Sequence, residues 1–156
     1  MGFNESTRAM IGNMALGLRV DRATATLPQG TAAAIFNIVG GKVLITGILG
    51  ECTTAIGGAN NTKLTANPTV ATAGSADLCA VVDTNACDVG DILSITGTPA
   101  DAMVAAHVGA CQMMGPLGVA CQVGTIDLDC AGSVTGAIKW SIWYIPLDDG
   151  AYVTAA

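Results

Sequence analysis

The sequence predicts an all-β fold, an antiparallel β-sandwich of the jelly-roll type with a short N-terminal arm. From Leu18 onward, segments rich in Thr, Val and Ile are interrupted at short intervals by Gly, Asn, Asp or Pro. Several of these segments alternate apolar and polar residues, which is the period of a half-buried strand. No apolar pattern of helical period runs for a useful length after the N-terminal segment. Short strands at regular spacing favour a sandwich over a βαβ arrangement.

The 156 residues have the length of one domain. Residues 1–17 show no lasting periodicity and are assigned to the arm, whereas residues 18–156 are assigned to the sandwich. The expected strands, in chain order, are Leu18–Leu27, Ala32–Val39, Lys42–Thr53, Lys63–Thr69, Asp77–Val82, Asp91–Thr96, Val104–Cys111, Val119–Asp129 and Val134–Pro146.

The clearest alternation lies in the last expected strand. Ile138, Trp140, Ile142 and Tyr144 share one face, because successive side chains of a strand point to opposite sides. We expect this face to pack in the core. Trp143 points the other way, and we expect it at an interface or partly exposed.

A second strand shows the same pattern with acidic residues on its polar face. Ile126, Leu128 and Cys130 share one side, and Asp127 and Asp129 share the other. Two carboxylates about 7 Å apart fall within the range that glycosidases use. Carbohydrate clefts also need aromatic platforms, and the chain has only two Trp, two Tyr and two Phe. We therefore interpret the pair as a solvated strand face.

Two local signals concern connections between strands. Gly40-Gly41 predicts a two-residue hairpin that joins the second and third strands. The segment Thr98–Val108 also fits a short helix, because Thr98 suits the cap, Pro99 the first helical position and Asp101 the positive end of the helix dipole.

Composition excludes several classes of function. A net charge of −6 with six Lys and Arg argues against a nucleic-acid partner, which requires clustered cations. Charged residues make up 12%, about half the usual share, and mean hydropathy is +0.56. Much of the surface is therefore expected to be covered by another chain. We expect no signal peptide and no membrane partner, since Ala102–Gly124, the longest uncharged run, contains Pro116 and four glycines.

Recognisable catalytic groups are missing from the sequence, so we expect no catalytic residues and no enzyme activity. The single histidine, His107, has an apolar setting with no acidic residue nearby in the sequence, and we interpret it as structural. None of the five serines lies in a GxSxG elbow. Gly40-Gly41 and Gly57-Gly58 lack the lysine or helix that binds phosphate, so no cofactor is expected.

The six cysteines have neither CxxC spacing nor a neighbouring histidine, so we expect no metal site. The segment Asp83–Asp91 matches a calcium loop at its first two ligand positions only, and we interpret it as a polar loop. In a reducing cytosol the cysteines act as small buried apolar residues. Outside cells, Cys79 with Cys87 or Cys111 with Cys121 would close short loops.

Charge is distributed unevenly along the chain. Residues 1–42 carry a net +2 and residues 43–156 a net −8. Chance clustering is one explanation, and a basic arm that docks onto an acidic partner is the other. On the second interpretation, Arg8, Arg19 and Arg22 belong to an interface, together with Trp143.

Five segments carry a resemblance that covers most of the chain from Arg19 to about Tyr152, and none of them contains recognisable chemistry. They are Val20–Pro28, Ile35–Glu51, Gly124–Leu128, Gly136–Trp140 and Tyr144–Ala151. In these segments the sequence resembles a family of small virion proteins of tailed bacteriophages.

The resemblance implies a noncatalytic role in the virion. Its most specific implication is a capsid cement or decoration protein on the capsid exterior, forming homotrimers on the major capsid protein and assembling in the bacterial host cytoplasm. Two alternatives stay open. One is a tail or baseplate component, and the other is a carbohydrate-binding β module for host contact that uses Asp127, Asp129 and Trp143.

Overall fold

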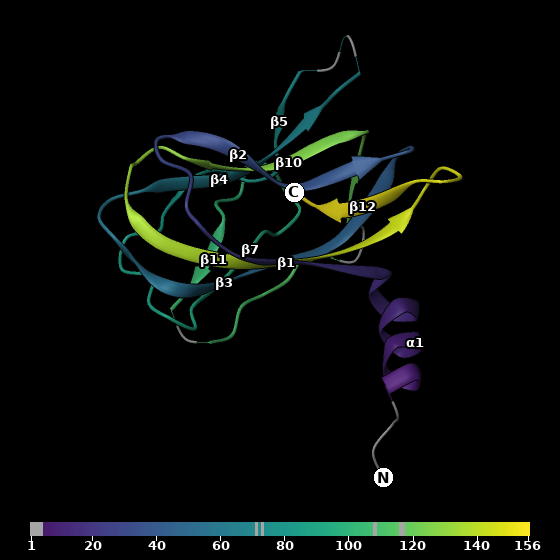
Figure 1. Ribbon diagram of the computed structural model, residues 1–156, viewed down its shortest axis with the longest axis horizontal. Helices are drawn as coiled ribbons and strands as arrows, with labels where there is room; N and C mark the ends of the chain where they lie inside the picture. Colours follow the sequence, from purple (N-terminus) through teal and green to yellow (C-terminus); the bar gives the residue numbers. More distant parts are fainter. Residues whose placement is uncertain (1–4, 71, 73, 108, 116–117) are drawn as a thin grey trace.

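Two antiparallel β-sheets face each other in the computed structural model, which confirms the predicted all-β sandwich (Figure 1). The structure describes residues 5–70, 72, 74–107, 109–115 and 118–156. The elements are α1 (Glu5–Leu16), β1 (Leu18–Thr26), β2 (Thr31–Val39), β3 (Val43–Gly57), β4 (Asn61–Pro68), β5 (Ala76–Asp77), β6 (Val82–Asp83), β7 (Ile92–Ser94), β8 (Val104–Ala106), β9 (Val119–Cys121), β10 (Gly124–Cys130), β11 (Thr135–Pro146) and β12 (Tyr152–Ala155).

Strands from distant parts of the chain are neighbours in both sheets. The first sheet has the order β1-β11-β3-β7-β8, with β9 also paired to β3. The second has the order β12-β2-β10-β4-β5, with β6 also paired to β4. The late strands β11 and β10 therefore occupy central places between early strands.

The core lies between the two sheets, and the core-facing sides predicted for β11 and β10 are confirmed. Trp140 is 1% exposed, and its apolar neighbours on the same face of β11 are equally buried. Gly50 pairs with Trp140 across the sheet, and a Cβ atom there would lie 2.8 Å from the indole ring. The missing side chain of Gly50 thus makes room for the largest residue of the core.

The predicted Gly40-Gly41 hairpin is wrong, because β2 and β3 belong to different sheets. The chain crosses between the sheets here, and Gly40 adopts a φ of 80°. Asp148 holds the crossing in place by accepting hydrogen bonds from the Lys42 backbone N–H (2.7 Å) and from Lys42 Nζ (2.8 Å). A glycine pair signals a sharp turn, but it does not specify which sheet the next strand joins.

The helix considered for Thr98–Val108 is also absent from the described part of this segment. The Asp101 N–H donates to the Thr98 carbonyl (3.0 Å), and the Asp101 carboxylate accepts a bond from Thr96 Oγ1 (2.7 Å). These bonds close a turn, and β8 follows as a partner of β7. The carboxylate that suited a helix N-terminus stabilises this turn instead.

Other boundaries differ because pairing partners change along the chain. The expected strand Asp77–Val82 is two short strands, β5 and β6, that each pair with β4. The expected strand Val119–Asp129 is split into β9, which pairs with β3, and β10, which belongs to the other sheet. The last strand, β12, was not expected.

The N-terminal segment forms a helix, α1, for which the sequence showed no periodicity. Gly17, with a φ of 89°, donates its N–H to the Asn13 carbonyl at 3.1 Å and ends the helix in the manner of a glycine C-cap. The Thr46 hydroxyl bonds the carbonyl of Leu16. Figure 1 shows α1 projecting away from both sheets, so it contributes little to the core.

Candidate functional site

Exposed apolar side chains gather on α1 and at the end of the sandwich next to it. Pairing of Leu18 with Tyr144 and of Val39 with Tyr152 places the start of β1, the ends of β2 and β11 and the start of β12 at this end. Seven of the ten exposed large hydrophobic residues in the described part of the chain lie here. They form what we call the α1-end surface: Met10, Met14, Leu18, Val39, Ile145, Leu147 and Tyr152.

Two of the predicted interface residues contact each other on the outer face of the first sheet. The Arg19 guanidinium lies over the Trp143 ring, 5.2 Å from its centre. Arg19 Nε also pairs with Asp21 Oδ1 at 2.8 Å, and Ser141 Oγ donates to the same oxygen at 2.5 Å. Partial burial raises the pKa of Asp21, but the bonds from Ser141 and Arg19 outweigh it, and the pKa falls below its usual value.

The other two predicted interface residues are not part of this group. Arg22 donates from Nε to the carbonyl of Ala156 at 3.2 Å, and its strand partner is the inward-facing Trp140. Arg22 thus ties β1 to the chain end beside β12, whereas Arg19 lies on the outer face. Arg8 is in α1, but its side chain lies outside what the structure describes.

The second candidate site is a cluster that strand pairing creates around His107. Ile92 of β7 pairs with Ala106 of β8, so the residue before β7 meets the residue after β8. His107 Nδ1 consequently lies 2.9 Å from Asp91 Oδ2. The Asp91 side chain is 12% exposed and that of His107 is 51% exposed, which places the pair at the protein surface.

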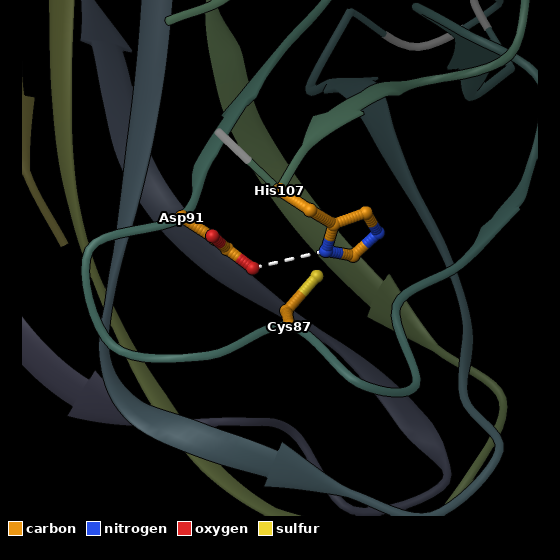
Figure 2. A group of neighbouring side chains, drawn as sticks. All are labelled: Cys87, Asp91 and His107. Carbon is orange, nitrogen blue, oxygen red and sulfur yellow. Dashed lines mark hydrogen bonds and ion pairs between the residues drawn. The ribbon is translucent and has the colours of Figure 1, made fainter. Parts of the chain in front are cut away.

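A tight turn brings Cys87 to the same point. The Cys87 N–H donates to the Thr84 carbonyl at 3.1 Å, and Ala86 adopts a φ of 68°, which residues other than glycine rarely adopt. One ligand atom from each of Cys87, Asp91 and His107 lies within 4.8 Å of the other two. Figure 2 shows the Cys87 thiol pointing toward the near nitrogen of His107, beside the hydrogen bond between that nitrogen and the Asp91 carboxylate. We call these three residues the Cys-Asp-His cluster.

Backbone hydrogen bonds tie this turn to the long strand β3. The Cys52 N–H donates to the Asp91 carbonyl, and the Cys52 carbonyl accepts from the Gly90 N–H, both at 2.9 Å. The Ile56 N–H donates to the Cys87 carbonyl, also at 2.9 Å. The buried Cys52 thiol interacts with the Cys87 thiol. The backbone that carries two of the three cluster residues is thus fixed to a central strand.

The electrostatics of the cluster disfavour a reactive thiolate. Burial, followed by the Asp91 carboxylate, raises the pKa of Cys87. Burial and Cys87 raise the pKa of Cys52 to about 12. The Asp88 N–H and then His107 hold the pKa of Asp91 below its usual value. A catalytic cysteine requires a lowered pKa, so this arrangement does not suit nucleophilic catalysis, whereas its sulfur, nitrogen and oxygen donors are those of metal sites.

Sequence spacing gave no signal for this cluster. Cys87 and His107 are separated by two strands and a turn, and they meet only because β7 and β8 pair. The acidic partner that His107 lacks nearby in the sequence is supplied from the other strand.

The sequence predicts a solvated face for Asp127 and Asp129, and this prediction is only partly correct. Both lie on the outer side of β10, but Asp127 is buried, and its Oδ1 has no hydrogen-bond partner among the described residues. A register shift between Ile126 and Asp127 accompanies this burial. Trp143 belongs to the other sheet and faces the opposite side of the sandwich. The three residues proposed for glycan contact therefore do not line one cleft.

Comparisons with known proteins add no family assignment. The sequence matches no protein-family model, and neither the curated proteins nor the solved structures yield a match. Within the described ranges, no helix has the length and apolar character needed to cross a membrane.

Proposed function

We propose that this chain is a noncatalytic structural protein of a tailed-bacteriophage virion. Its most specific form is a capsid cement or decoration protein that binds the major capsid protein lattice from the exterior as a homotrimer and stabilises it. The resemblance from Arg19 to about Tyr152 supports the virion assignment. The low content of charged residues supports extensive contact with other chains.

The strand order supports the jelly-roll form of the sandwich. A jelly roll is a double sheet of eight strands built from two Greek keys, and it recurs in viral capsid and lectin domains. Here β1-β11-β3-β7 faces β2-β10-β4-β5, so in each sheet one late strand, β11 or β10, lies between two early strands. In this interpretation β12 extends the second sheet beside β2, and β6, β8 and β9 are short additions.

The observation that carries the assembly role is the α1-end surface. Met14 is 81% exposed and Met10 58% exposed on a helix that projects from the sandwich. Large apolar side chains concentrated at one end of a protein are typical of contact with another chain. We therefore assign this end, with α1, to contact with the capsid protein or a neighbouring subunit.

Locating the chain in the particle tests the proposal. Virions of the phage that encodes the chain are purified, the chain is detected by mass spectrometry, and the particle is reconstructed by electron cryomicroscopy. We expect density for three sandwiches around each three-fold position on the capsid exterior, with α1 at a contact.

Each other outcome of this experiment rejects a stated part of the proposal. Density in the tail or baseplate overturns the capsid placement and favours the tail alternative. Absence of the chain from purified particles overturns the virion role altogether.

A further inference from the structure

We propose that Cys87, Asp91 and His107 bind a Zn²⁺ ion through one sulfur, one oxygen and one nitrogen atom, with a fourth coordination position open to solvent. This inference concerns a different part of the molecule from the α1-end surface. It does not depend on the virion role.

The donor atoms have the chemistry and the spacing that zinc requires. Zinc in proteins is bound by cysteine sulfur, histidine nitrogen and carboxylate oxygen at about 2.0 to 2.3 Å, which puts tetrahedral donors about 3.3 to 3.8 Å apart. In the cluster His107 Nδ1 and Asp91 Oδ2 are 2.9 Å apart, and the three ligand atoms all lie within 4.8 Å of one another. Side-chain adjustments of about 1 Å therefore bring them to coordination distance.

The backbone that carries the three residues is held by strand pairing and hydrogen bonds that do not depend on a metal ion. Asp91 and His107 adjoin the paired strands β7 and β8, and the carbonyls of Asp91 and Cys87 bond β3. Asp91 Oδ2 also accepts a 2.9 Å bond from the Asp88 N–H, which fixes the position of this oxygen. Such supporting bonds are a regular feature of metal sites.

The charge around Cys87 favours a cation. The Asp91 carboxylate lies beside this thiol, and the carboxylates of Asp83 and Asp88 act on it as well. When Zn²⁺ binds, the Cys87 thiol releases its proton to solvent, and His107 binds as the neutral imidazole with its proton on Nε2, so the ion takes the place between Nδ1 and Oδ2. The exposed His107 ring leaves the fourth position accessible to water.

Metal binding to the full chain tests the site directly. The chain is prepared without a histidine tag, because His107 is its single histidine, and all cysteines are kept reduced. Isothermal titration with Zn²⁺ is expected to give one ion per chain. Co²⁺ is expected to give a thiolate-to-cobalt charge-transfer band.

Matched variants identify the ligands. His107→Gln changes an exposed side chain, so the fold should be retained, and Zn²⁺ affinity should fall about tenfold or more. Cys87→Ser should abolish the charge-transfer band, whereas Cys111→Ser, a half-buried thiol outside the cluster, should retain both binding and band. Circular dichroism of each variant checks the fold.

Two results overturn the site. One is the absence of a bound ion at about tenfold excess of Zn²⁺ over protein. The other is equal affinity of His107→Gln and the unchanged chain. Because His107→Gln does not depend on the buried cysteines, the test remains decisive even if Cys87→Ser fails to fold.

Discussion

Trp140 and Trp143 lie on opposite faces of β11, and their surroundings differ accordingly. Trp140 fills the core against Gly50, whereas Trp143 is half-buried on the outer face beneath the Arg19 guanidinium. Alternation in the sequence was sufficient to separate the two roles, because one face of the sheet is buried and the other is not.

Trp140→Ala should therefore lower the free energy of unfolding by about 3 to 5 kcal/mol, through lost burial and the cavity left behind. Trp143→Ala, the matched control, should cost about 1 to 2 kcal/mol, since it loses a cation–π contact and partial burial. Chemical denaturation of both variants measures the difference. Near-equal losses would show that the two faces of β11 are not distinguished by packing.

A second residue-scale prediction concerns acid stability at the crossing between the sheets. The bonds from Lys42 Nζ and the Lys42 N–H hold the pKa of Asp148 below its usual value of 3.8. Because the folded-state pKa is the lower one, the carboxylate stabilises the fold above pH 3.8, and this stabilisation is lost as the pH falls toward the folded-state pKa.

Asp148→Asn should thus lower the melting temperature at neutral pH and flatten its decline in acid. Asp149→Asn, which removes the same charge from the exposed neighbouring residue, serves as the control. Melting temperatures between about pH 6 and pH 2 provide the measurement. Identical pH profiles for the two variants would contradict the role given to the Lys42 contacts.

At the scale of elements, α1 is joined to the sandwich mainly through its C-terminal end. Gly17 ends the helix, and the Thr46 hydroxyl bonds the Leu16 carbonyl. Removing residues 1–16 should accordingly change the unfolding free energy of the sandwich by less than about 1 kcal/mol while weakening attachment to particles that lack the protein. Calorimetry and a particle-binding assay measure the two effects.

A point variant separates the apolar surface of α1 from the helix itself. Met10→Gln with Met14→Gln preserves helix propensity and removes two exposed apolar side chains. It should weaken attachment nearly as much as the deletion, whereas Arg19→Ala with Arg22→Ala should give a smaller, salt-sensitive loss. Full attachment by the truncated chain would assign docking to the sandwich alone.

The strands were largely predictable from the sequence, but their partners were not. Alternation in β10 and β11 predicts which face is buried, and the burial of both faces confirms it. Sheet membership depends on pairing between distant segments, which a local glycine pair does not report, so the hairpin predicted at Gly40-Gly41 is wrong. For the same reason, the spacing of Cys87 and His107 in the sequence does not indicate that their side chains lie close together. The helix α1 is ended by a glycine cap rather than marked by an apolar stripe, and period analysis missed it.

At the scale of the whole molecule, the exposed apolar residues of the α1-end surface predict self-association. A chain with mean hydropathy +0.56 and 12% charged residues has few charges with which to keep such a surface in water. We expect a homotrimer or a larger ring, in line with the preference of soluble oligomers for closed symmetry. Multi-angle light scattering at micromolar concentration measures the mass, and a monodisperse species of 15.5 kDa would reject the prediction.

The central positions of β10 and β11 also determine when the protein can fold during its synthesis. When the ribosome has completed β1 to β4, each sheet has two strands whose shared neighbour has not yet been made. Until residues 124–146 emerge, β1 and β3 in one sheet and β2 and β4 in the other have no strand between them, so the nascent chain carries unpaired strand edges. A premature stop before residue 124 would release a fragment with open edges in both half-sheets, prone to pair with other chains. Productive folding of this protein thus depends on residues 124–146, which are synthesised after the strands between which they pair.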